Sequence, residues 1–104
     1  MLVKTEEIED LPKDIRTGKK IISIYGLGFV GTAITAVWLR AGATVIAADK
    51  NNKIVNSINY KKIANTEPKA NEAFIEAVNN KRLFATRNIK LASKKSQIKI
   101  ISVP

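Results

Sequence analysis

The chain has 104 residues and a formal net charge of +9; 45% of its residues are hydrophobic, 26% are charged, and none is cysteine or histidine. This length builds one domain at most, and the missing residue types exclude disulfides, thiolate metal sites, thiol nucleophiles and the commonest neutral-pH acid–base group. Residues 1–18 carry a net charge of −2 and residues 19–104 one of +11, which favours either an anionic partner such as a nucleotide or a solvated lysine-rich surface.

Residues 1–18 are polar, and we expect them to form a leader that precedes a domain at 19–104. Apolar residues between Ile8 and Ile15 recur at helical spacing, which predicts a short amphipathic helix ending near Gly18. A flexible arm is the alternative interpretation.

The first strand of the domain is predicted from about Lys20 to Tyr25, because this run is apolar and rich in β-branched residues. It leads into a Gly-x-Gly-x-x-Gly turn made by Gly26, Gly28 and Gly31. The first glycine permits the tight turn, the second lets the backbone approach a pyrophosphate, and the third lets the following helix pack closely on the strand. Amides of the helix's first turn then face the phosphates, so the sequence predicts a dinucleotide site.

The helix after the turn is predicted from about Phe29 to Ala41, with Gly42 as its stop. Apolar residues at 3.6-residue spacing are expected to form its buried face: Val30, Ala33, Ile34, Val37, Trp38 and Ala41.

A membrane span is an alternative for residues 21–39, which carry no charge over 19 positions and could also be read as a signal anchor. Three glycines within six residues and a second strand-like run directly afterwards argue against it. Buried parallel strands joined to buried helices also produce uncharged runs, so we expect no membrane partner.

The second strand, from about Thr44 to Ala48, leads into Asp49, 18 residues past the third glycine. A carboxylate there can accept hydrogen bonds from both hydroxyls of an adenosine ribose and would repel the 2′-phosphate of NADP, so Asp49 predicts NAD. Capping of the next helix is its alternative role. Lys50 and Lys53 weaken the preference for NAD over NADP, because a lysine beside the acid can bind a phosphate.

The rest of the chain continues to alternate helices and strands. We predict a helix capped by Asn51 or Asn52, a helix opened by Thr66 and Pro68, a strand at 83–86, a short helix at 88–94 and a strand at 98–103. Such alternation predicts an α/β fold with a parallel sheet, and right-handed crossovers give the strand order 3-2-1-4. A complete doubly wound domain carries further strands, so we expect a truncated Rossmann-like dinucleotide-binding domain.

The segment Ile-Tyr-Gly-Leu-Gly-Phe-Val-Gly at 24–31 resembles the Gly-Leu-Gly-(Tyr/Phe)-Val-Gly signature of the UDP-glucose/GDP-mannose dehydrogenase family. The resemblance covers residues 20–104 and is greatest to UDP-N-acetylmannosamine or UDP-N-acetylglucosamine dehydrogenases. Further matches follow in the family's order: Ala41-Gly42, Asp49, Asn59, Glu67-Pro68, Lys81-Arg82-Leu83, Ala85-Thr86 and 100–104.

The resemblance implies an NAD-dependent oxidation of the primary alcohol of a UDP-sugar to a carboxylate, with a catalytic cysteine in a later part of the enzyme. The 104-residue chain alone should therefore be inactive, with no catalytic residue and no metal site. A cytoplasmic location and a homodimer formed through a later helix are implied as well. Cofactor contacts are expected at Gly26, Leu27, Gly28, Phe29, Val30, Gly31, Asp49, Lys50, Val103 and Pro104.

Three departures from the family pattern bear on this assignment. Tyr60 stands where a glycine often follows Asn59, so we expect that loop to be reshaped. Ile54 stands where a basic residue is common, and Lys53 lies one place earlier. Asn80 replaces a helix-ending glycine, and we expect it to adopt the left-handed conformation that asparagine tolerates.

Other functions compete with this interpretation. A stand-alone NAD-binding regulatory module without catalysis is the alternative that also uses the glycine turn. A nucleic-acid-binding domain is disfavoured, because the four arginines are scattered along the chain instead of clustering, so we expect no nucleic-acid partner.

Overall fold

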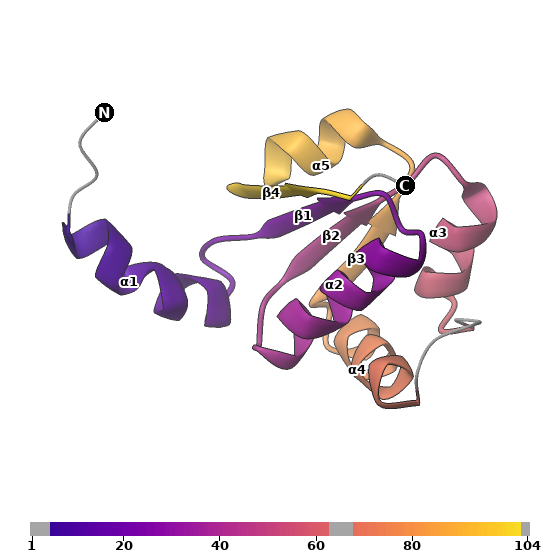
Figure 1. Ribbon diagram of the computed structural model, residues 1–104, viewed down its shortest axis with the longest axis horizontal. Coiled ribbons are helices and arrows are strands. Elements are labelled where there is room, and N and C mark those ends of the chain that lie inside the picture. The colour runs from indigo at the N-terminus through magenta and orange to yellow at the C-terminus, as the bar shows by residue number, and fades with distance from the viewer. Residues whose placement is uncertain (1–4, 63–67, 103–104) are drawn as a thin grey trace.

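The computed structural model describes residues 5–62 and 68–102 (Figure 1). After the first helix, helices separate successive strands, with two helices between the second and third strands, as predicted. In chain order the elements are α1 (Thr5–Arg16), β1 (Ile22–Tyr25), α2 (Phe29–Arg40), β2 (Val45–Ala48), α3 (Asn52–Asn59), α4 (Pro68–Asn79), β3 (Leu83–Thr86), α5 (Ile89–Lys95) and β4 (Ile98–Ile101).

The four strands form one sheet in the order β3-β2-β1-β4. All three neighbouring pairs are parallel; Ile22 of β1, for example, lies opposite Val45 on one side and Ile98 on the other. The predicted order is therefore confirmed. Parallel pairing places the carboxyl ends of all four strands at the same edge of the sheet, where the segments after β1, β2 and β3 meet.

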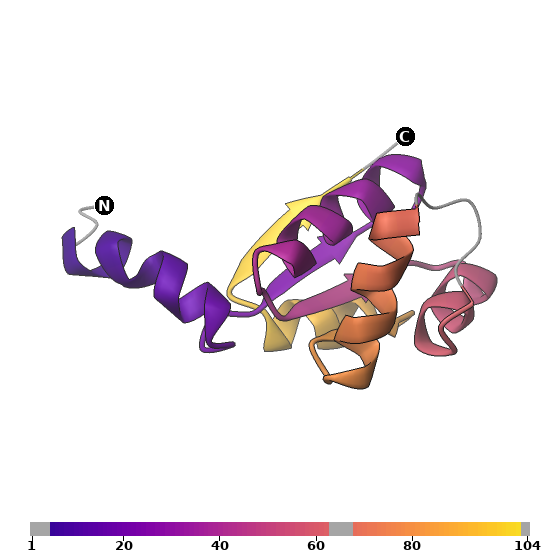
Figure 2. The same cartoon turned by 90° about the horizontal axis from the view of Figure 1, so that it is seen from below.

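Helices cover both faces of the sheet (Figures 1 and 2). The main core lies between the sheet and α2, α3 and α4, and it includes Ile22, Val45 and Phe74. A smaller cluster on the opposite face joins Ile46 and Ala48 to Ala92 of α5. The middle strand β2 is consequently buried along its whole length, which explains its uninterrupted apolar sequence.

The buried face of α2 differs from the predicted one. Residues that were expected to be buried and are exposed are Val30 (59%), Ala33, Val37 (61%) and Ala41. The buried residues are Gly31, Thr35, Ala36 and Leu39, with Ile34 and Trp38 partly buried against the core.

A side chain at Gly31 would collide with the carbonyl oxygen of Gly26, so this position has to face the turn. Thr35 follows one turn later and is accommodated because its hydroxyl donates to Gly31 O at 2.8 Å. Close packing at a glycine, not the largest apolar residues, fixes the rotation of this helix.

Four helices are followed by a residue with left-handed backbone conformation, and after α1 this residue is Gly18 (φ +79). In α2 this residue is Gly42 (φ +92), whereas α3 and α4 use Lys61 (φ +61) and Lys81 (φ +60). The prediction that Asn80 takes this conformation is wrong by one position. Since α4 ends at Asn79, Asn80 is its C-cap, and the left-handed residue of this motif is the one after the C-cap.

Asn59, the last residue of α3, holds the outer edge of β3. Its side-chain amide donates to Ala85 O at 2.8 Å, and Ala85 N donates back to Asn59 Oδ1 at 3.0 Å. Arg82 makes a comparable bridge at the other end of β3, donating to Leu39 O at 3.2 Å and Ala43 O at 3.1 Å. Both side chains therefore bond to backbone groups that find no partner in the pairing of β3 or at the end of α2.

The predicted amphipathic helix before the domain is present as α1, and Gly18 follows it with φ +79. Ile15 is buried in the main core, so the last turn of α1 packs against the domain. Residues 21–39 divide between β1 and α2, which removes the basis for a membrane span. Within the described ranges, 5–62 and 68–102, every helix is too short or too polar to cross a bilayer.

Candidate functional site

The turn between β1 and α2 is shaped by close backbone contacts. Gly26 has φ +95, and its amide donates to Ala48 O at 2.8 Å, which ties the turn to the end of β2. A Cβ at Gly26 would collide with the carbonyl oxygen of Ser102, and one at Gly31 with that of Gly26. Glycine is therefore required at both positions by packing alone, whatever the site binds.

Gly28 has a different environment. It is the N-cap of α2 with φ −69 and ψ −165, and a Cβ built on it meets nothing within 4 Å. The fold does not need glycine here, so the space in front of α2 is open. Phe29 and Val30, the next two residues, are 86% and 59% exposed. The first amides of a helix lack partners inside it, and this N-cap offers no side-chain acceptor, so the open end of α2 suits an anion.

The Asp49 carboxylate lies beside this turn. Its Oδ2 accepts a hydrogen bond from Leu27 N at 2.7 Å, and its Oδ1 accepts one from Asn51 N at 2.8 Å. The capping role that was the alternative for Asp49 falls to Asn51, whose side chain accepts from Lys53 N and Ile54 N. Each carboxylate oxygen keeps a second lone pair, so Asp49 can accept further hydrogen bonds from a ligand.

Leu27 joins the turn to this carboxylate. Its side chain is buried in the main core, and its amide is engaged by Asp49. The turn amides consequently divide into one that holds the acid and those at the start of α2 that face open space.

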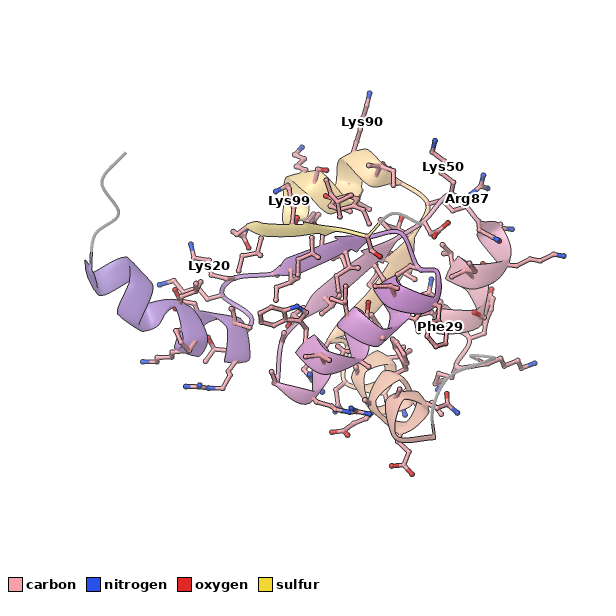
Figure 3. The ribbon with its side chains drawn as sticks, viewed as in Figure 1. Lys20, Phe29, Lys50, Arg87, Lys90 and Lys99 are labelled. Atoms are coloured by element: carbon pink, nitrogen blue, oxygen red, sulfur yellow. The ribbon has the colours of Figure 1, made fainter. Side chains whose placement is uncertain are left out.

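Cations flank Asp49 on its other side. Lys50 is exposed, and its carbonyl oxygen accepts a hydrogen bond from Arg87 Nε at 3.2 Å. Figure 3 shows both side chains at the end of the molecule that also carries Phe29, opposite the end with Lys20. Sequence reasoning missed Arg87, although its position directly after β3, beside the end of β2, gave a signal once the strand order 3-2-1-4 was predicted.

The structure thus brings together eight of the ten predicted cofactor contacts at the carboxyl edge of β1 and β2. Val103 and Pro104 lie outside the described residues, as does the proposed cap Thr66. Ser102, which precedes Val103, donates its amide to Tyr25 O at 2.8 Å and so runs alongside the turn.

This arrangement fits a dinucleotide. The open position at Gly28 is one that a Cβ would fill, and the amides at the start of α2 are donors for phosphate oxygens. The carboxylate of Asp49 is an acceptor for ribose hydroxyls. The bonds from Gly26 N to Ala48 O and from Leu27 N to Asp49 Oδ2 join the end of β1 to the end of β2. They thereby fix the carboxylate relative to the open position at Gly28 and the first amides of α2.

Comparisons with known proteins agree with this geometry. A family model described as UDP-glucose/GDP-mannose dehydrogenase family, NAD binding domain, matches residues 20–104. A search of curated proteins gives no match.

Solved structures of nucleotide-sugar dehydrogenases share the fold. GDP-mannose dehydrogenase from Pseudomonas aeruginosa is 30% identical over 80% of this chain, with a TM-score of 0.75. UDP-glucose dehydrogenase from the hyperthermophilic archaeon Pyrobaculum islandicum is 26% identical over 81%, with a TM-score of 0.73. UDP-N-acetylmannosamine dehydrogenase from Staphylococcus aureus is 22% identical over 82%, with a TM-score of 0.70, and shows similarity of fold alone. The matched part spans 19–20% of the length of these proteins.

Proposed function

Because the chain belongs to the UDP-glucose/GDP-mannose dehydrogenase family through its NAD-binding domain, we propose that it is the cofactor-binding portion of a nucleotide-sugar dehydrogenase. The whole enzyme would oxidise the primary alcohol of a UDP-sugar, such as UDP-N-acetylmannosamine, to a carboxylate. The cytoplasmic location and the homodimer implied by the family resemblance belong to the same proposal.

One observation carries the assignment: the Asp49 carboxylate is hydrogen-bonded to the glycine turn at Leu27, next to the open helix start at Gly28. This bond supports the proposal because it holds a carboxylate that could accept from a ribose next to amides that could donate to phosphates.

The residues of the chain then have separate tasks. Gly26 and Gly31 allow the close backbone contacts that form the turn, and Leu27 holds the acid. The amides at Gly28, Phe29 and Val30 receive the pyrophosphate, and Asp49 accepts from the ribose hydroxyls, with Lys50 beside it. Val103 and Pro104 are assigned to the adenosine side.

When bound, NAD supplies the hydride acceptor for the oxidation. The chain's own contribution is binding and orientation, since it contains neither cysteine nor histidine. The substrate-binding and catalytic groups are assigned to the remainder of the enzyme.

Binding of NADH tests the proposal. The chain's single tryptophan, Trp38, lies nine residues after Phe29 in α2, about 14 Å along the helix axis, which suits energy transfer to a bound dihydronicotinamide. NADH should quench Trp38 emission saturably and gain fluorescence of its own.

The variant Gly28→Ala gives the sharpest comparison. A methyl group fits there without a clash and at a φ that alanine adopts freely, so folding should be unchanged. The methyl occupies the space that a pyrophosphate needs, so NADH affinity should fall about tenfold or more, which corresponds to about 1.4 kcal/mol. Ala41→Ser, which adds one heavy atom at the exposed far end of α2, is the control and should bind like the parent. Absence of NADH binding by the parent chain, or equal affinities of parent and Gly28→Ala, would refute the proposal.

A further inference from the structure

The ends of β2 and β3 bring a guanidinium to the residue that follows Asp49. Asp49 N donates to Thr86 O at 3.1 Å, and Arg87, the residue that follows β3, donates from Nε to Lys50 O at 3.2 Å. Figure 3 shows the Lys50 and Arg87 side chains beside each other. The backbone contact and the side-chain contact together hold Arg87 beside Lys50, the residue that follows the acid.

Arg87 keeps most of its binding capacity in this position. The bond to Lys50 O uses Nε, and the side chain is exposed, so its two terminal nitrogens can reach a ligand. A guanidinium fork of this kind matches two oxygens of one phosphate, which a lysine ammonium cannot do.

The local charge favours an anion despite the carboxylate. Three exposed cations belong to the segments around Asp49: Lys50 follows it directly, Lys53 lies four residues later, and Arg87 bonds to Lys50 O. Both oxygens of Asp49 already accept backbone amides, from Leu27 and from Asn51, and these dipoles offset part of its charge. The usual reason for rejecting a ribose 2′-phosphate, an uncompensated carboxylate, is therefore weakened here.

We propose that Arg87, assisted by Lys50, binds the 2′-phosphate of a ribose held at Asp49, so that this chain accepts NADP(H) as well as NAD(H). The inference rests on the proposed function, because it requires the adenosine ribose at Asp49. Arg87 is then a specificity-determining residue contributed by the strand next to the one that carries the acid.

Two adenosine nucleotides that differ only in the 2′-phosphate test this directly. Adenosine 2′,5′-bisphosphate should bind the parent chain at least as tightly as adenosine 5′-monophosphate, as measured by calorimetry. The difference between them should shrink with added salt, because the extra phosphate contact is electrostatic.

The variant Arg87→Ala should lower the affinity for the bisphosphate about tenfold and change that for the monophosphate by less than about twofold. Lys81→Ala is the charge-matched control, because it removes one positive charge at the opposite end of β3, and it should leave both affinities unchanged. The same pattern should appear with NADPH and NADH in Trp38 energy transfer.

The outcomes separate the two proposals. Binding of the monophosphate with rejection of the bisphosphate would overturn this inference and leave the proposed function standing. An equal loss of affinity for the bisphosphate and the monophosphate in Arg87→Ala would also overturn it. Binding of neither nucleotide by the parent chain would overturn the proposed function along with it.

Discussion

The carboxylate of Asp49 accepts a hydrogen bond from the amide of Leu27 at 2.7 Å, joining two residues that are 22 positions apart in the sequence. The second oxygen accepts from Asn51 N at 2.8 Å. Asp49 therefore has a structural role before any ligand is considered: it fastens the glycine turn to the segment between β2 and α3. A ligand that bonds to Asp49 would meet a group whose orientation is already fixed.

Asp49→Asn should destabilise the chain. An asparagine offers one acceptor oxygen, so one of the two amides, of Leu27 or of Asn51, would face an NH₂ group instead. Loss of a charge-assisted bond to a half-buried group is expected to lower the free energy of unfolding by about 1–3 kcal/mol, measured by urea denaturation. Glu72→Gln, an exposed neutralisation on α4, is the control and should change it by less than about 0.5 kcal/mol. Equal stabilities of Asp49→Asn and the parent would show that these bonds contribute nothing.

The strand–turn–helix at 22–40 could be predicted because local chemistry determines it. Gly26 is required by its φ of +95 and Gly31 by its contact with the Gly26 carbonyl, both within this segment, and Asp49 follows the next strand at the spacing that places it beside the turn. The sheet order also followed from the sequence, since alternation of strands and helices with right-handed crossovers leaves few arrangements.

Two other features could not be predicted in the same way, because they depend on three-dimensional packing that the apolar pattern and the charges do not reveal. The rotation of α2 is set by contact between Gly31 and the Gly26 carbonyl, which overrides the apolar pattern of Val30 and Val37. The position of Arg87 beside Lys50, 37 residues away in the chain, depends on the pairing of β2 with β3. Charge alone could not distinguish Arg87 from the other basic residues.

Lys81→Gly should stabilise the fold. Lys81 has φ +60 at the end of α4, a conformation that costs a residue with a Cβ about 1 kcal/mol relative to glycine. The free energy of unfolding should rise by about 1 kcal/mol, seen as a shift of the urea midpoint with an unchanged slope.

Lys81→Ala separates backbone strain from charge in that experiment. Alanine removes the same positive charge but keeps the Cβ, so it should not reproduce the gain. If alanine and glycine stabilised the chain equally, relief of charge repulsion would explain the effect and backbone strain would not.

Asn59→Ala should destabilise the edge of the sheet. Both backbone groups of Ala85, which is 2% exposed, bond to the Asn59 side chain, and alanine would leave them without these partners. We expect a loss of about 2–3 kcal/mol in the free energy of unfolding. Asn59→Asp keeps an acceptor for Ala85 N but loses the donor to Ala85 O, so its free energy of unfolding should lie between those of the parent and Asn59→Ala. Asn56→Ala, exposed on the same helix, is the control and should not lose stability, because alanine has the higher helix propensity. A loss as large as that of Asn59→Ala would mean that the bonds to Ala85 are not the cause.

Tyr25 should titrate below the ordinary tyrosine value of 10.0. Burial alone would raise the pKa of its phenol, but the neighbouring hydroxyls of Ser23, Ser93 and Ser96 and the charge of Lys99 lower the pKa further than burial raises it. The bond to Ser93 Oγ is 2.7 Å long. Because the pKa is depressed in the folded state, ionised Tyr25 stabilises the fold above pH 10, and this contribution disappears as the pH falls through the folded-state pKa. The tyrosinate absorbance of the parent minus that of Tyr25→Phe gives this titration directly; a midpoint at or above 10.0 would mean that burial outweighs the serine bonds and Lys99.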